Sequence, residues 1–274
     1  MLGAIIGDTV GSIYEFDNIK TKDFNLFSKE MFFTDDTVMT IAVAEAIMNG
    51  GKHQHYVECM KRWGLLYFNK GYGGHFREWL TLELEDSGPY NSWGNGSAMR
   101  VSPCGWVAKL DIPIEEGIKQ TENLAKVSSE VTHNHPEGIK GAQATAVSIF
   151  YMRHGKSKNA INEYKEILKN EIEKRYNYDL NFTLDEIRPS YRFDVSCQGT
   201  VPQAIVAFLE STDFEDAIRN AISIGGDSDT LAAITGSIAE AAYGIPNEIK
   251  EKTMGYLDDK IKEAYDKWID FLKK

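Results

Sequence analysis

The chain has 274 residues, of which 42% are hydrophobic, so it can bury a sizeable core in one or two domains. Its formal net charge of −11 argues against a general affinity for nucleic acid backbones, because such affinity needs a basic face. Three separated cysteines without a CxxC pair favour neither a disulfide framework nor a zinc ribbon, and they fit a reducing, cytoplasmic compartment. We see no basic leader and no apolar stretch of membrane-spanning length, so we expect no membrane association.

Helical periodicity covers most of the sequence. Taken in chain order, it predicts helices over residues 37–49, 137–154, 157–175, 214–224, 230–243 and 257–272. Asp213 is expected to cap the fourth of these helices, and Pro246 to occupy the first position of a further one. The helix over 230–243 is rich in alanine and glycine, and small residues let neighbouring helices approach closely. We therefore expect it at the centre of the fold.

Two regions lack a clear helical pattern. Residues 69–104 are dense in glycine, tryptophan and asparagine and are predicted to form a long irregular segment, which in a compact domain is usually functional. Residues 190–197 alternate weakly and fit either a short strand or a loop. Because no βαβ rhythm or internal repeat is present, the sequence predicts one all-α, orthogonal multi-helix domain over residues 1–274.

Two clusters of aspartate and threonine precede apolar helices, in "FTDDTVMT" (33–40) and "GGDSDTLAA" (225–233). An aspartate or threonine before a helix is most simply a cap, but a cap needs one oxygen and each cluster offers several. Hard oxygen ligands of this kind suit Mg²⁺, Mn²⁺ or Ca²⁺ rather than zinc. We predict that the clusters share a binuclear metal site in a cleft, with the ligands Thr34, Asp35, Asp36, Asp227, Asp229 and Thr230.

A further carboxylate follows the N-terminal segment "GAIIGDTVGSIYEFDN". Gly7, Gly11 and Ser12 keep one face of that segment small, which permits close packing against another element. Glu15 is then either a solvated residue after a packed helix or a carboxylate with access to the metals. In the second interpretation it acts as a base or as a ligand.

Five motifs occur in order: "GAIIGDTVGSIYEF", "FTDDTVMT", "WGNGSAMRVSPCGW", "THNHPEGIKGA" and "GGDSDTLAAITGSIAEA". Together they resemble the ADP-ribosylglycohydrolase family over about residues 3–245, nearly the whole chain. The resemblance implies an all-α fold, two Mg²⁺ or Mn²⁺ ions, and cleavage at the anomeric carbon of ADP-ribose on a modified acceptor, with ADP-ribose as product. It implies catalytic roles for Glu15 and Asp36, and metal binding by the two clusters.

The same resemblance assigns "SWGNGSAMR" to the loop that holds the pyrophosphate and distal ribose, and it places a histidine near these groups. A glycine-rich loop suits that role because its backbone N–H groups bind phosphate oxygens. The expected substrate contacts are Ser92, Trp93, Gly94, Asn95, Gly96, Ser97 and His133.

Other functions are open at this point. A non-catalytic ADP-ribose binder or structural relative would keep the fold without activity. An isoprenoid synthase would need DDxxD, whereas Asp36 is followed by Thr37, Val38 and Met39. A haloacid-dehalogenase-like phosphatase would need its "DSDTL" after an N-terminal strand. His133 and His135 form an HxH, but no third histidine or cysteine accompanies them for zinc.

The acceptor stays open in the sequence. Arginine, serine, a nucleic acid end, poly(ADP-ribose) and a small metabolite all fit, as do both Mg²⁺ and Mn²⁺. The charged segment 156–195 carries no family motif, and we expect a surface helix and loop near the cleft that influence the choice of acceptor. For the assembly we expect a monomer.

Overall fold

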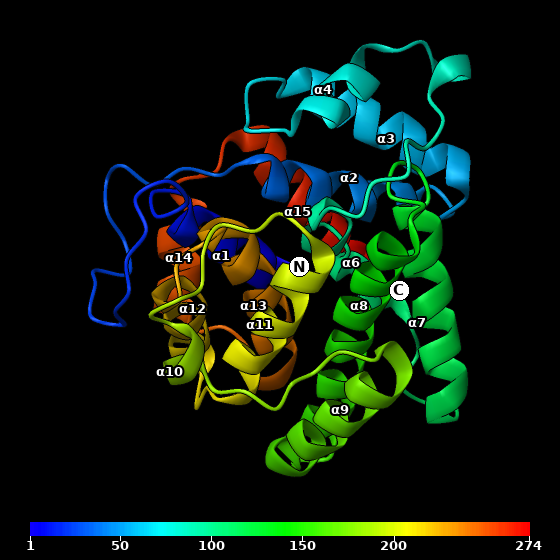
Figure 1. Cartoon of the computed structure of the whole chain (residues 1–274). Helices are drawn as coiled ribbons and strands as arrows, with labels where there is room; N and C mark the ends of the chain where they lie inside the picture. The colour runs from blue at the N-terminus through cyan, green and yellow to red at the C-terminus, as the bar shows by residue number, and fades with distance from the viewer.

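Fifteen α-helices and one short 3₁₀-helix, without a β-sheet, form the computed structural model, which describes residues 1–274 (Figure 1). The predicted all-α class is confirmed. The helices are α1 (Leu2–Gly11), α2 (Asp35–Met48), α3 (His53–Leu66), α4 (Gly74–Thr81), η1 (Leu84–Asp86), α5 (Gly96–Met99), α6 (Ser102–Val107), α7 (Ile114–Ser129), α8 (Pro136–Ser157), α9 (Ile161–Tyr176), α10 (Leu184–Ile187), α11 (Cys197–Leu209), α12 (Phe214–Ser223), α13 (Ser228–Tyr243), α14 (Asn247–Met254) and α15 (Asp259–Leu272).

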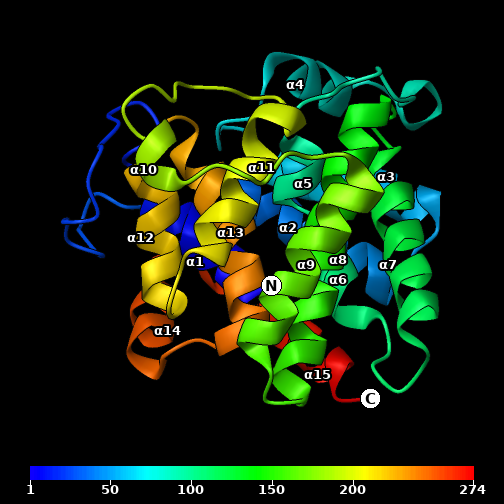
Figure 2. The same cartoon turned by 60° about the horizontal axis from the view of Figure 1, so that its bottom comes forward.

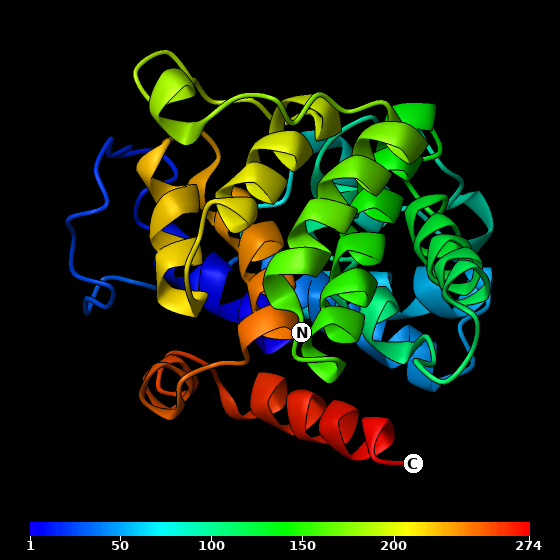
Figure 3. The ribbon, with the colours of Figure 1, turned by 90° about the horizontal axis from the view of Figure 1, so that it is seen from below.

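Helices α1 and α13 lie side by side at the centre of the fold (Figures 1 and 3). Every residue of α1 is buried, as are nearly all residues of α13. Glycines bring the two backbones into contact: a Cβ atom on Gly7 would lie 2.0 Å from the carbonyl oxygen of Ala232, and one on Gly11 would lie 2.4 Å from Cα of Asp229. The small residues of both helices therefore set their separation, as expected for the central helix.

The other helices surround this pair. α7, α8 and α9 form one flank, and α11 and α12 form the other (Figure 2). α3 and α4 lie above α2 in Figure 1, and the C-terminal helix α15 packs against α2 at the edge of the fold (Figure 3). One continuous hydrophobic cluster of 73 buried residues joins these elements. The cleft thus rests on a single core.

Most predicted helices are confirmed with small changes at their ends. Asp213 caps α12, since its carboxylate accepts a hydrogen bond of 2.9 Å from the backbone N–H of Asp216. Gly244 adopts a φ of 79° and ends α13. Pro246 is the N-cap of α14 rather than its first helical residue.

The expectation of a long irregular segment over 69–104 is wrong in part. This region contains α4, η1, α5 and the start of α6. α4 begins directly after Gly73, and two glycines obscure its helical pattern in the sequence. The helix forms because it buries Phe76, Trp79 and Leu80 on one face. Residues 190–197 form no strand, and their only pairing is an isolated bridge between Gly94 and Ser196.

None of the helices combines the length and the apolar character that crossing a membrane requires.

Candidate active site

A cavity of about 400 Å³ opens where the N-terminal ends of α2 and α13 meet, within the usual range for a small-molecule site. The turn after α1, the loop before α4 and the loop before α5 form much of the rest of its wall. Seven of the lining residues are hydrophobic, and carboxylates, glycines and histidines make up much of the rest. The predicted cleft therefore lies at the junction of segments from both ends of the chain.

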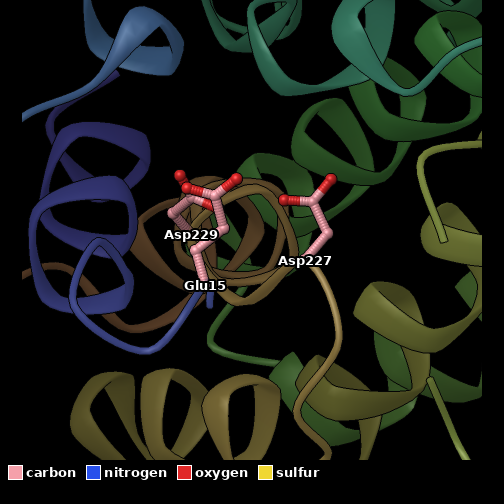
Figure 4. Close-up of side chains that lie close together, drawn as sticks. All are labelled: Glu15, Asp227 and Asp229. Carbon is pink, nitrogen blue, oxygen red and sulfur yellow. The ribbon is translucent and has the colours of Figure 1, made fainter. Parts of the chain in front are cut away.

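Carboxylates from the two aspartate clusters open onto this cavity. Asp35 and Asp36 line it from α2, while Asp227 and Asp229 line it from the start of α13. Oxygens of Glu15, Asp227 and Asp229 lie within 4.8 Å of one another, and Figure 4 shows these three side chains gathered at the start of α13. A group of this composition and spacing can hold a metal ion.

The start of α2 is held in place by a buried aspartate that the sequence analysis did not select. Asp8, from α1, accepts hydrogen bonds from the backbone N–H and the hydroxyl of both Thr34 and Thr37. The Thr34 hydroxyl also accepts a hydrogen bond of 3.3 Å from the Asp36 N–H and so caps α2. Asp8 thereby fixes the junction from which Asp35 and Asp36 project.

In the absence of a cation, burial and mutual repulsion disfavour the ionised form of these carboxylates. Burial raises the pKa of Asp35, Asp36 and Asp229 well above the ordinary range, and the charges of neighbouring carboxylates raise it further. Burial, followed by the charges of Asp227 and Asp8, raises the pKa of Glu15 to about 7. No cationic side chain contributes to these shifts, and none forms an ion pair with these carboxylates.

One oxygen of the cluster has no partner at all. Oδ2 of Asp36 is buried and makes no hydrogen bond, whereas both oxygens of Asp8 are occupied. A buried carboxylate oxygen without a partner is costly, because it has lost its hydration without replacement. Carboxylate oxygens are the preferred ligands of hard divalent cations, so the donor set fits a metal.

The glycine-rich loop forms the opposite wall of the cavity. Ser92, Gly94, Asn95, Gly96 and His133 all line it. The amide of Asn95 donates a hydrogen bond of 2.7 Å to Asp227 and another of 3.1 Å to the hydroxyl of Thr200. This amide orients a carboxylate of the acidic cluster, which is a different contact from the predicted one with substrate.

Three predicted site residues do not line the cavity. Thr34 is buried against Asp8, as described above. Ser97 is buried, and its hydroxyl donates a hydrogen bond of 2.7 Å to the carbonyl of Gly138. Trp93 is 48% exposed outside the cavity. Thr230 does line it, beside Asp229.

The structure also adds residues to the site. The segment "GYGGHF", residues 71–76, lines the cavity before and within α4, together with Tyr90, Arg100, Phe193 and Val195. Three glycines within four positions were a usable signal, since a glycine-rich stretch next to a helix suits an anion. Phe193 and Val195 belong to the charged segment without a motif, which therefore reaches the cavity at its end.

A family model described as ADP-ribosylglycohydrolase matches residues 1–272. ADP-ribosylarginine hydrolase Tri1 of Pseudomonas putida is 27% identical over 92% of this chain and 72% of its own length. ADP-ribosylhydrolase ARH3 of Homo sapiens is 24% identical over 93% of this chain and 88% of its own. A solved structure described as an "ADP-ribosylglycohydrolase-related protein complex" has a TM-score of 0.64 and 22% identity, with 93% of each chain covered, which shows a shared fold.

A match of this length places the chain among hydrolases that act on ADP-ribosyl glycosidic bonds, as the five motifs predict. The chain belongs to the ADP-ribosylglycohydrolase family. The predicted family and enzyme class are therefore confirmed.

Replacing Asp8 with asparagine is expected to lower the free energy of unfolding by about 2 kcal/mol, because the amide NH₂ cannot accept from the Thr34 and Thr37 donors. It should also weaken Mn²⁺ binding, since the junction that carries Asp36 loses its anchor. Urea unfolding and calorimetry measure the two effects. Asp213→Asn is the matched control, because asparagine caps a helix nearly as well as aspartate. Equal behaviour of the two variants would show that Asp8 does not position the site.

Proposed function

We propose that residues 1–274 act as one domain that removes ADP-ribose from a modified acceptor by metal-dependent hydrolysis at the anomeric carbon. The observation that carries this proposal is the cluster of carboxylates from both ends of the chain, which faces one cavity and forms no ion pair with a cationic side chain. The glycine-rich loop across the cavity supplies backbone N–H groups suited to a pyrophosphate. Membership of the family supports the same chemistry.

The carboxylates fit two divalent cations, Mg²⁺ or Mn²⁺. Asp35 and Asp36 would hold one ion and Asp227, Asp229 and Thr230 the other. The Thr34 hydroxyl donates its proton to Asp8 and so keeps a lone pair for a cation. When bound, the cations supply positive charge that orients a ribose diol and makes a water molecule more acidic.

Glu15 is the proposed proton acceptor, and Asp36 assists from α2. Glu15 is half-exposed on the cavity wall, so water and a ribose can reach its carboxylate. Burial raises the pKa of the Glu15 carboxylate in the metal-free chain, and a carboxylate that is more basic than usual is suited to take a proton from water and return it. Asn95 holds Asp227 in place through its 2.7 Å hydrogen bond, which fixes the position of this carboxylate relative to the glycine-rich loop.

The test is release of free ADP-ribose from a panel of substrates modified on arginine, on serine and on nucleic acid ends, each with Mg²⁺ and with Mn²⁺. We expect metal-dependent release from at least one of them. Tri1 is named for arginine, so that substrate is the first of the panel. Tight ADP-ribose binding without release from any substrate would instead identify a non-catalytic binder.

Metal should stabilise the chain more at neutral than at acidic pH. Without metal, burial raises the pKa of Glu15 from 4.5 to about 7, so the folded chain binds a proton that the unfolded chain has released. That contribution is fully present below about pH 4.5 and is lost as pH rises through about 7. A cation compensates the charges that then appear. Melting curves with Mn²⁺ and with EDTA should differ more at about pH 7.5 than at about pH 5.5.

The Asp229→Asn variant serves as the control for this measurement, because it lacks one of the proposed ligands. Its melting temperature should respond little to Mn²⁺. If EDTA leaves the melting temperature of the unmodified chain unchanged at both pH values, a tightly bound metal centre is ruled out.

A further inference from the structure

Arg100 is a buried arginine beside the cavity without a carboxylate partner. Arg100 is 1% exposed, and it lines the cavity from the C-terminal end of α5. The Nη2 atom donates hydrogen bonds of 3.1 Å to the carbonyl of Ser128 and 2.9 Å to the hydroxyl of Thr132. Burying a guanidinium group without an opposite charge costs folding free energy, so a functional role would explain why Arg100 is buried here.

The Thr132 hydroxyl connects Arg100 to His133. Its oxygen lies 2.7 Å from Nδ1 of the His133 ring. A guanidinium N–H can only donate, so the hydroxyl oxygen accepts from Arg100 and keeps its own proton. Nδ1 of His133 lies within hydrogen-bond distance of this hydroxyl, and it is placed to accept that proton.

The chain of donors decides which nitrogen of His133 carries the ring proton. If Nδ1 accepts from Thr132, a neutral imidazole must carry its proton on Nε2. Burial, with the charge of Arg100, lowers the pKa of His133 well below its usual range, so the ring is neutral. The hydrogen bond from Thr132 then selects Nε2–H as the donor of the neutral ring.

The Nε2 atom faces the glycine-rich loop. A Cβ atom on Gly96 would lie 3.1 Å from it, which is a tight contact, whereas one on Gly94 would lie 3.6 Å from it in ordinary van der Waals contact. Glycine at position 96 therefore leaves space beside this nitrogen. Both glycines and His133 line the cavity. The opposite tautomer would present a lone pair here and repel an anionic oxygen, whereas Nε2–H attracts one.

We propose that Arg100, through Thr132, is a positioning residue that fixes His133 in the neutral Nε2–H tautomer, so that the ring donates a hydrogen bond to a phosphate oxygen of the substrate. The assignment of the phosphate rests on the proposed function, but the tautomer does not. The ring of Tyr90 lies beside the imidazole, with the two ring centroids 6.0 Å apart. Arg100 thus acts on the substrate indirectly.

The test compares two replacements of Thr132 in the full chain. Thr132→Val keeps the shape of the side chain and removes the hydroxyl, while Thr132→Ser keeps the hydroxyl. Nitrogen-15 NMR of the imidazoles reports the tautomer, and the His133→Gln variant assigns the signal among the six histidines. We expect Nε2–H in the unmodified chain and in Thr132→Ser, and loss of that preference in Thr132→Val.

Affinity for ADP-ribose gives the second readout. Thr132→Val should bind ADP-ribose about tenfold more weakly, whereas Thr132→Ser should stay within about twofold, on the scale of one hydrogen bond to a charged group. Circular dichroism and melting curves confirm that both variants are folded. A proton on Nδ1 in the unmodified chain, or an unchanged tautomer in Thr132→Val, would overturn the proposal. Correct tautomers without release of ADP-ribose from any substrate would instead count against the proposed function alone.

Discussion

The Glu15→Gln variant is expected to release ADP-ribose about a hundredfold more slowly than the unmodified chain, or slower still, which is the usual scale for a general acid or base. Glutamine keeps the size of the side chain and removes its ability to take a proton. Binding of ADP-ribose should stay within a few-fold, because the aspartates and the glycine-rich loop are unchanged. Single-turnover assays and calorimetry separate the rate from the affinity.

Two further variants give this result its meaning. Asp17→Asn makes the same kind of change two residues along, at an exposed position, and should leave the rate unaltered. Asp229→Asn should lose metal and ligand affinity together with the rate, since its carboxylate belongs to the acidic cluster. A fully active Glu15→Gln enzyme would end the proposed role and return the base function to an aspartate such as Asp36.

Gly7→Ala should be among the most destabilising single substitutions in the chain. The added Cβ would lie 2.0 Å from the carbonyl oxygen of Ala232, and both atoms belong to backbones that cannot rotate out of the way. Overpacking of this kind costs about 3 kcal/mol or more. Because α1 carries Asp8 and α13 carries Asp229, the shift should also weaken metal binding.

Gly88→Ala is the matched control, because a Cβ atom at that position meets nothing within 4 Å and its φ is negative. It should leave stability unchanged within about 0.5 kcal/mol, as expected for a surface substitution. Urea unfolding of both variants measures the difference. A Gly7→Ala protein as stable as Gly88→Ala would show that α1 and α13 tolerate a wider separation than their contact implies.

The sequence predicted the helical class well because amphipathic periodicity is a local property, and most of the helices here bury one face. It predicted the candidate ligands for a similar reason, since each aspartate cluster is contiguous and adjoins an apolar helix. Asp35, Asp36, Asp227 and Asp229 all reach one cavity. Their metal-binding roles stay predictions until an ion is observed.

What the sequence could not reveal depends on partners far along the chain. Asp8 looks like any polar residue in a short apolar segment until Thr34 and Thr37 are placed against it. Asn95 belongs to a loop motif that suggests substrate contact, yet its amide bonds Asp227. α4 was missed because two glycines precede its buried face, and glycine lowers helix propensity without forbidding a helix start.

The pairing of α1 with α13 has a consequence for biosynthesis. Glu15 and Asp36 leave the ribosome early, whereas Asp227 and Asp229 follow only when most of the chain has been made. The partial chain exposes the apolar surface of α1 without its main partner, so it depends on protection until α13 arrives. Half of the acidic cluster is too sparse to retain a divalent cation firmly. We therefore expect the chain to bind cations only after α13 has been synthesised, and chains truncated before α13 should remain both unfolded and metal-free.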